Sequence, residues 1–256
     1  MSDVVAIIGR HPVREAIARE PLALEKVLLQ QGLRSLGSLR RQAYEAGVPV
    51  QDVPLARLKK LAGGIPHQGV MAVRAALAYT QLEGMLQGIA PDLDAVRRTK
   101  PRLLVLDCIE DPRNYGALIR SAIAAGIQGL IVTSRRMAPL NATVVKASAG
   151  TALRIPVART DQLSETLYQL KERGYHVAGT AMQGGVSVWS VDWDRPMAVV
   201  VGSEGAGLRS SVAQECDFMI TIPMPGDVES LNVSVAAGII LFAATAPPGI
   251  SSPSLS

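Results

Sequence analysis

The sequence predicts an α/β protein of two domains, the second of which is built on a mostly parallel sheet. Short β-rich runs alternate with amphipathic stretches along nearly the whole chain. After residue 102 the apolar runs become almost continuous, as in parallel strands that are covered on both faces. A polar segment over 80–100 separates the two series, and 256 residues are enough for two hydrophobic cores.

The first series predicts a small α/β domain over residues 1–78. Its expected strands are 4–9, 24–29, 48–53 and 69–75. Its expected helices are 11–20, 33–47 and 54–63. The following segment, 79–100, carries charge and Pro91 and lacks strand character, so we interpret it as a linker with some helix.

The second series predicts a larger α/β domain over residues 101–247. Its expected strands are 102–109, 129–133, 175–182, 197–202 and 218–224. Its expected helices are 115–126, 141–150, 163–174, 208–217 and 231–246. Residues 248–256 are expected to form a disordered tail.

Composition excludes several classes of protein. Hydrophobic residues make up 48% of the chain and charged residues 19%, which is ordinary for a globular protein. The sequence shows neither a signal-peptide pattern nor an apolar run of about 18 residues, so we expect no membrane association. Cys108 and Cys216 have neither disulfide-framework nor zinc-ligand spacing, so we expect reduced thiols, no metal site and a cytoplasmic location.

The positive charge is concentrated in the N-terminal third. Residues 1–80 hold 11 basic and 6 acidic side chains, whereas residues 101–256 hold 12 basic and 13 acidic ones. This imbalance predicts that the first domain contacts a polyanion.

Three polar or glycine-rich loops follow strands of the second domain, at 110–120, 201–209 and 222–232. Parallel sheets bind ligands beyond the carboxyl ends of their strands. The glycines of 202–207 are in the order G-x-x-G-x-G, which argues against a dinucleotide loop and a nicotinamide-dependent oxidoreductase. No phosphate-binding P-loop pattern is present in the sequence either.

The polar residues of these loops have ordinary explanations when they are taken singly. Arg120 could extend to solvent, and Ser230 could be the N-cap of the last helix. Asn232 stands two residues further on, so we expect its side chain to point away from the cap. Together with Asn114 and Glu204, these groups predict one site.

Three stretches carry a resemblance to a known family. "NYGALIR" (114–120), "VVGSEGAGL" (200–208) and "IPMPGDVESLNVSVAAGI" (222–239) resemble, in order and spacing, the motifs of SpoU-type RNA ribose 2′-O-methyltransferases of the SPOUT superfamily. The resemblance implies a trefoil-knotted C-terminal domain. "GRHPVREAI" (9–17) and "HQGVMAV" (67–73) look like the family's L30e-like RNA-binding domain.

The resemblance also implies a reaction and a range of targets. The branch that the chain resembles most methylates a guanosine in the P-loop of 23S rRNA. Methylases of tRNA ribose and of the thiostrepton-resistance rRNA site share the motifs and remain alternatives. A non-catalytic RNA-binding factor in ribosome assembly is an alternative from another class, although the motif residues expected for catalysis are intact.

The site residues that the resemblance implies fall into three groups. S-adenosylmethionine is expected to bind near Thr180, Gly202, Ile222, Met224 and Leu231. The catalytic residue is expected to be Arg120, supported by Asn114, Glu204, Ser230 and Asn232. The RNA-binding residues are expected to be Arg10, His11, Arg14, His67, Gln68 and Arg113.

Two further expectations concern mechanism and assembly. A guanidinium stays protonated in proteins, so Arg120 is expected to stabilise a developing alkoxide rather than to act as a base. Ser234 is expected to serve helix packing or the capping turn. Family members form homodimers through the C-terminal domain, which would place Arg120 next to the partner subunit's cofactor.

Overall fold

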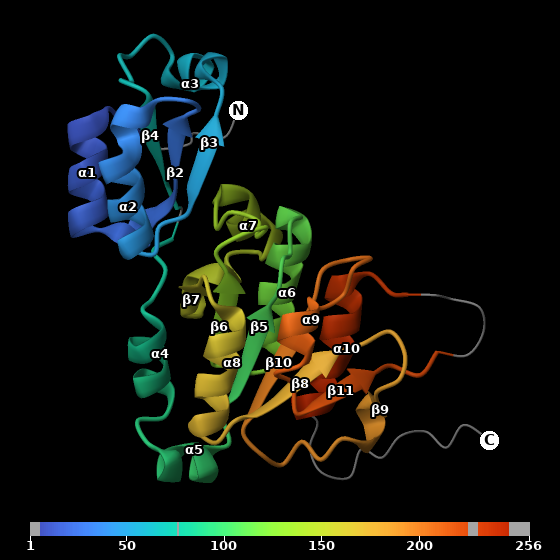
Figure 1. Ribbon diagram of the computed structural model, residues 1–256. Coiled ribbons are helices and arrows are strands. Elements are labelled where there is room, and N and C mark those ends of the chain that lie inside the picture. Colours follow the sequence, from blue (N-terminus) through green and yellow to red (C-terminus); the bar gives the residue numbers. More distant parts are fainter. Residues whose placement is uncertain (1–5, 76, 225–229, 246–256) are drawn as a thin grey trace. The chain divides into compact units, whose positions relative to one another are not determined.

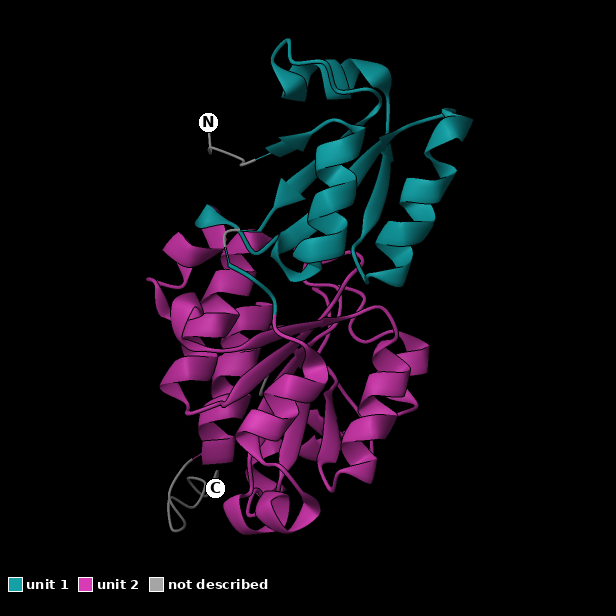
Figure 2. Ribbon diagram, turned by 90° about the vertical axis from the view of Figure 1, so that its left-hand side faces the viewer, with its two compact units in different colours: residues 1–79, 139–142 teal, residues 80–138, 143–256 magenta. Residues whose placement is uncertain are grey.

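The computed structural model describes residues 6–75, 77–224 and 230–245 (Figure 1). The chain divides into two compact units, residues 1–79 with 139–142 and residues 80–138 with 143–256 (Figure 2). The expected tail, 248–256, and residues 225–229 of the third loop lie outside the described residues.

The first unit is a small mixed sheet with helices on both faces. In chain order its elements are β1 (Ala6–Ile8), α1 (Arg10–Arg19), η1 (Pro21–Ala23), β2 (Leu24–Gln30), η2 (Arg34–Leu36), α2 (Gly37–Glu45), β3 (Val50–Val53), α3 (Leu55–Ala62) and β4 (Val70–Arg74). The sheet order is β1-β4-β2-β3; β2 and β3 are parallel, and the other neighbours are antiparallel. Val27 and Leu29 of β2 pack with α1 and α2, whereas Leu28 packs with α3, because successive strand residues face opposite sides.

From residue 80 the chain builds a seven-stranded parallel sheet and its helices. In chain order the elements are α4 (Leu82–Ile89), α5 (Leu93–Thr99), β5 (Arg102–Leu106), α6 (Pro112–Ala124), β6 (Gly129–Thr133), α7 (Ala142–Ala147), η3 (Thr151–Arg154), β7 (Val157–Thr160), α8 (Leu163–Glu172), β8 (His176–Thr180), β9 (Val186–Ser187), η4 (Val188–Ser190), β10 (Met197–Val201), α9 (Ser210–Ala213), β11 (Phe218–Thr221) and α10 (Val233–Thr245). The sheet order is β7-β6-β5-β10-β8-β11-β9, with every neighbouring pair parallel. The predicted α/β class with a mostly parallel sheet is therefore confirmed.

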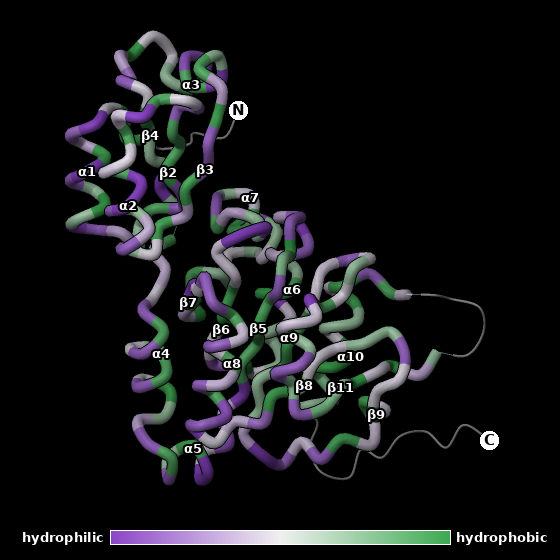
Figure 3. Tube along the Cα trace, viewed as in Figure 1, coloured by the Kyte–Doolittle hydropathy of each residue, from purple (hydrophilic) through white to green (hydrophobic). Residues whose placement is uncertain are grey.

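The central strands of this sheet are buried on both faces. Leu103 and Val105 of β5 pack in a core cluster with α4, α5, α8 and α9. Leu104 and Leu106 face the opposite side and are also fully buried. The hydrophobic colouring of β5 and β6 in Figure 3 reflects the continuous apolar runs that predicted this arrangement.

Of the segment expected to be a linker, 79–100, residues 80–100 are part of the second unit. They contain α4 and α5, and Met85, Leu86 and Val96 of these helices are buried in the core cluster. These apolar residues recur at helical spacing, so burying them gains more than leaving the segment as an exposed connection.

Several element boundaries also differ from the expectations. Strands β7 and β9 lie at the two edges of the sheet and were not expected. Helix α7 ends at Ala147 because Ala149 and Gly150 adopt left-handed conformations, with φ of 51° and 80°. Helix α9 ends at Ala213, ahead of Asp217, which binds the backbone of β8 through its own amide and its carboxylate.

Two features that the resemblance implied remain predictions, namely the trefoil knot of the second unit and the L30e-like character of the first. No helix in the described parts of the chain is both long enough and apolar enough to cross a membrane.

Candidate functional site

A pocket of about 430 Å³ lies at the carboxyl ends of β8, β10 and β11. It is lined by the glycine-rich loop after β10, by residues that follow β8 and β11, and by the start of α10. Its volume suits a small molecule, for which pockets of roughly 300–1,000 Å³ are typical. All of the expected cofactor residues line it, namely Thr180, Gly202, Ile222, Met224 and Leu231.

The chemistry of the pocket wall suits a ligand with a flat apolar ring and a polar edge. Leu208, Met219 and Ile240 supply apolar surface. Gly202, Gly205 and Gly207 bring main chain without side chains to the pocket wall, where backbone groups can bind a polar ring edge. The residues present therefore fit an adenosine-containing cofactor.

The glycine-rich loop is a tight turn closed by its own backbone. Ser203 and Gly207 exchange two backbone hydrogen bonds, each 3.0 Å long. Gly205 and Gly207 have φ of 86° and 66°, which favours glycine. A Cβ atom on Gly202 would lie only 2.2 Å from the carbonyl carbon of Gly207, so only glycine fits at this position.

Three of the predicted catalytic side chains are joined at the edge of this pocket. The Asn232 amide nitrogen donates to Oε1 of Glu204 at 2.6 Å and to Oδ1 of Asn114 at 3.2 Å. Glu204 also accepts from the backbone N–H of Val233, at 3.4 Å. The fold thus brings together groups that follow β5, follow β10 and precede α10.

The cap of the last helix is Asn232, and the expectation that Ser230 caps it is wrong. Helix α10 begins at Val233, and Asn232 Oδ1 accepts from the N–H groups of Ser234 and Val235, at 3.0 and 3.4 Å. Asn232 therefore points to the cap, contrary to the expectation. An amide carries both an acceptor and donors, so one side chain caps the helix and binds Glu204.

The two serines of this turn have different positions. The Ser234 hydroxyl donates to Asn232 Oδ1 at 2.6 Å and so belongs to the capping turn. Ser230 is exposed and lines the pocket. Its predicted role is therefore separate from capping.

We expect Asn232→Ala to lower the free energy of unfolding by about 0.5–2 kcal/mol, because the helix loses its cap. Ser230→Ala is the matched control and should leave stability within about 0.5 kcal/mol of wild type. Urea titration followed by circular dichroism measures both. Equal losses in the two variants would contradict the assignment of the cap to Asn232.

Arg120 stands apart from this polar cluster. It lies on α6 six residues after Asn114, so the two side chains leave the helix about 120° apart. Helix α10 packs against α6, where Gly238 lies close to the Ser121 side chain. Arg120 is exposed, and no hydrogen bond joins it to Asn114, Glu204 or Asn232 in the described part of the chain. Its catalytic role remains a prediction.

Arg113 occupies the same side of α6 as Arg120, because residues seven apart share a helix face. Both are exposed. Asp111 is the N-cap of the helix, and its carboxylate accepts from the Arg113 N–H at 2.7 Å. The two guanidiniums are therefore presented to solvent from one rigid element.

The RNA-binding candidates of the first unit gather around the start of α1. Arg10 donates through Nε to the Gln68 carbonyl at 3.1 Å, and the Gln68 side chain accepts from the Arg10 N–H at 3.1 Å. His67 accepts from the Gly69 N–H at 3.0 Å through Nδ1, which gives it a structural role in this turn. His11 and Arg14 are exposed on α1.

The two cysteines are poor nucleophiles. Burial raises the pKa of Cys216 to about 12. Burial, followed by the negative charge of Asp107, also raises the pKa of Cys108. Both thiols therefore stay protonated near neutral pH.

Sequence reasoning missed one pair of charged residues. Asp107, which was expected inside a strand, directly follows β5 and is fully buried, and it forms an ion pair with Arg209 at the end of the glycine-rich loop. A carboxylate at the end of an apolar run was the available signal, because a buried charge requires a partner.

Comparisons with known proteins match both parts of the chain. Residues 101–242 match the model of the SpoU rRNA Methylase family, and residues 6–80 match a model described as RNA 2′-O ribose methyltransferase substrate binding. A Staphylococcus haemolyticus protein named "Putative TrmH family tRNA/rRNA methyltransferase" is 39% identical over 244 residues, covering 94% of this chain and 95% of its own length.

Solved structures show the same fold. The SpoU methyltransferase AviRb from Streptomyces viridochromogenes, in complex with the cofactor AdoMet, aligns with a TM-score of 0.55 and 25% identity, covering 94% of this chain and 88% of that one. The A. aeolicus TrmH/SpoU tRNA modifying enzyme aligns with a TM-score of 0.53 and 30% identity, covering 57% of this chain and 74% of that one.

Proposed function

The chain belongs to the SpoU rRNA methylase family, and we propose that it methylates the 2′-oxygen of a ribose in RNA, using S-adenosylmethionine. The target that we propose is a guanosine in the P-loop of 23S rRNA. The observation that carries the reaction is the position of the Asn114–Glu204–Asn232 cluster at the edge of a pocket that suits the cofactor.

The proposed cofactor site is the pocket beside the glycine-rich loop. The AdoMet complex of AviRb supports this choice of cofactor, since its fold is similar over nearly the whole chain. Thr180, Gly202, Ile222, Met224 and Leu231 would hold the cofactor. When bound, S-adenosylmethionine supplies a sulfonium methyl group.

The residues of the chain would then orient and activate the ribose. Arg120 presents a positive charge that would stabilise the developing alkoxide of the 2′-oxygen, while the proton of that hydroxyl would pass to water or to a phosphate of the RNA. Hydrogen bonds join Asn232 to Asn114 and Glu204. They would hold the glycine-rich loop and the starts of α6 and α10 in fixed positions relative to one another. Ser230, exposed at the pocket, completes the polar edge.

The first unit is proposed to bind the RNA. Support comes from the substrate-binding family model over residues 6–80 and from the concentration of positive charge there. Arg10, His11, Arg14, His67 and Gln68 lie at or near the start of α1, and Arg113 would contact the RNA from α6.

The choice of RNA is testable because the family alternatives predict different products. Purified protein is incubated with tritiated S-adenosylmethionine and either 23S rRNA or total tRNA, and ribose methylation is then mapped by alkaline hydrolysis. We expect labelling of one guanosine in the P-loop. Labelling of tRNA, or of the thiostrepton-binding region of the rRNA, would show that this RNA, and not the P-loop guanosine, is the target. Binding of RNA without any methyl transfer would favour the assembly factor.

We also propose a homodimer formed through α10. Val235 and Phe242 are 52% and 53% exposed, and they share a face because they are seven residues apart. An exposed apolar helix face marks an interface, and a second copy would cover it. Such a dimer could bring Arg120 of one subunit to the partner's cofactor.

We expect the double variant Val235→Glu, Phe242→Glu to be monomeric and to lose methyl transfer, because the charges cannot be buried at the interface. Light scattering coupled to gel filtration measures the mass. Tyr168→Glu, at a side chain 51% exposed on α8, is the control and should stay dimeric. A monomeric wild type would refute the interface.

A further inference from the structure

The two ends of the glycine-rich loop are tied to one residue outside it. The backbone N–H of Asp107 donates to the carbonyl of Val201, directly before the loop, at 2.9 Å. The carboxylate of Asp107 accepts from the backbone N–H of Arg209, directly after the loop, at 3.2 Å. Asp107 thus closes the base of the segment 202–208.

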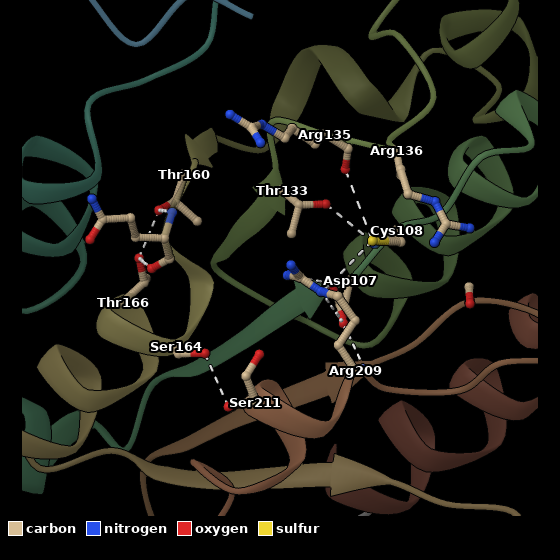
Figure 4. A network of polar contacts seen from close by, with 12 residues as sticks. Asp107, Cys108, Thr133, Arg135, Arg136, Thr160, Ser164, Thr166, Arg209 and Ser211 are labelled. Atoms are coloured by element: carbon tan, nitrogen blue, oxygen red, sulfur yellow. Dashed lines mark hydrogen bonds and ion pairs between the residues drawn. The ribbon is translucent and has the colours of Figure 1, made fainter. Parts of the chain in front are cut away.

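The guanidinium of Arg209 strengthens this tie. Its Nε and Nη2 atoms each lie 2.8 Å from Oδ1 of Asp107 (Figure 4). The Asp107 side chain is fully buried, whereas that of Arg209 is 48% exposed. Hydrogen bonding to Asp107 raises the pKa of Arg209, so the guanidinium keeps its positive charge. A buried carboxylate without such a partner is strongly destabilising.

The closed loop reaches the active-site cluster through Glu204. This residue is carried at the tip of the loop, between the backbone pair formed by Ser203 and Gly207, and it binds Asn232 and the start of α10. Spreading the base of the loop would therefore displace both the pocket wall and the partner of Asn232.

We propose that Asp107 and Arg209 are positioning residues for S-adenosylmethionine, which act by holding the loop 202–208 closed over the pocket. This inference rests on the proposed function. Neither residue lines the pocket in the described part of the chain, so the pair acts through the loop and makes no contact with the ligand.

Asp107→Asn is the informative variant, because it keeps the side-chain shape and leaves the uncoupled charge on the half-exposed arginine. We expect it to stay folded, to bind S-adenosylmethionine about 10-fold more weakly and to keep kcat near wild type at saturating cofactor. Isothermal titration calorimetry with S-adenosylmethionine and steady-state kinetics separate the two effects. A role in folding alone would not raise KM for the cofactor while sparing kcat.

Glu110→Gln is the matched control. Glu110 lies three residues after Asp107, in the segment that follows β5, and the substitution breaks an exposed ion pair with Arg136. It should leave cofactor affinity unchanged. Arg209→Lys, which keeps a positive charge and the backbone bond to Asp107, should bind the cofactor more tightly than Arg209→Met.

The outcomes distinguish this inference from the function on which it rests. If the wild type gives no heat with S-adenosylmethionine, the proposed function fails and the inference fails with it. If the wild type binds the cofactor and Asp107→Asn binds it equally well, the inference alone is overturned. Should Asp107→Asn unfold, Arg209→Lys carries the test, and affinity equal to that of Arg209→Met would overturn the inference.

Discussion

Arg120→Ala should abolish nearly all methyl transfer while leaving the fold and the cofactor site intact. Loss of one group that stabilises developing charge lowers kcat by about 10²–10³-fold. Arg120 is exposed, so its removal should change the free energy of unfolding by no more than about 0.5 kcal/mol. Incorporation of tritiated methyl groups into rRNA measures the first effect, and calorimetry with S-adenosylmethionine verifies that binding is retained.

Arg113→Ala is the control that the helix offers, because Arg113 is an exposed arginine on the same side of α6. It should raise KM for RNA and leave kcat close to wild type, as expected for a phosphate contact. Turnover near the wild-type rate in Arg120→Ala would remove Arg120 from the catalytic machinery.

Gly202→Ala should weaken cofactor binding strongly without unfolding the second unit. The added Cβ would lie 2.2 and 2.3 Å from the carbonyl carbon and oxygen of Gly207, and 2.5 Å from the Leu208 nitrogen. These are backbone atoms, so the loop itself must open. Overpacking of this kind costs about 1–3 kcal/mol, which corresponds to roughly 5- to 150-fold weaker binding.

Gly205→Ala tests whether the clash or the loop sequence matters. Gly205 lies in the same loop with φ of 86°, but no heavy atom lies within 4 Å of its Cβ position. Its substitution should therefore cost only the backbone strain, about 1 kcal/mol. Calorimetry with S-adenosylmethionine measures the affinity of both variants. An affinity of Gly202→Ala within about threefold of wild type, which is the experimental scatter, would contradict the close packing at Gly202.

Much of the second unit could be predicted because the signal is local. The five apolar residues of Met197–Val201 predict a central parallel strand without reference to the rest of the chain, and in the structure this strand is buried throughout. The expected cofactor residues came instead from the resemblance to the SpoU motifs. They lie at or just beyond the carboxyl ends of β8, β10 and β11, or just before α10, and the carboxyl ends of parallel strands meet at one edge of the sheet.

Local pattern left open how residues 79–100 pack. The sequence predicted a linker with some helix there; the structure has α4 and α5, and Met85, Leu86 and Val96 are buried in the core cluster. Periodicity shows that a segment has an apolar face, but it does not show whether a sheet is within reach to bury it.

The roles of Asn232 and Asp107 depended on contacts between distant parts of the chain. Asn232 and Asn114 are separated by 118 positions, and Asp107 and Arg209 by 102. The sequence alone predicts that polar groups lie at the ends of strands and helices. Which of them caps α10, and which ties the loop, follows from the packing that brings the ends together, because hydrogen bonds of about 3 Å leave no tolerance for another arrangement.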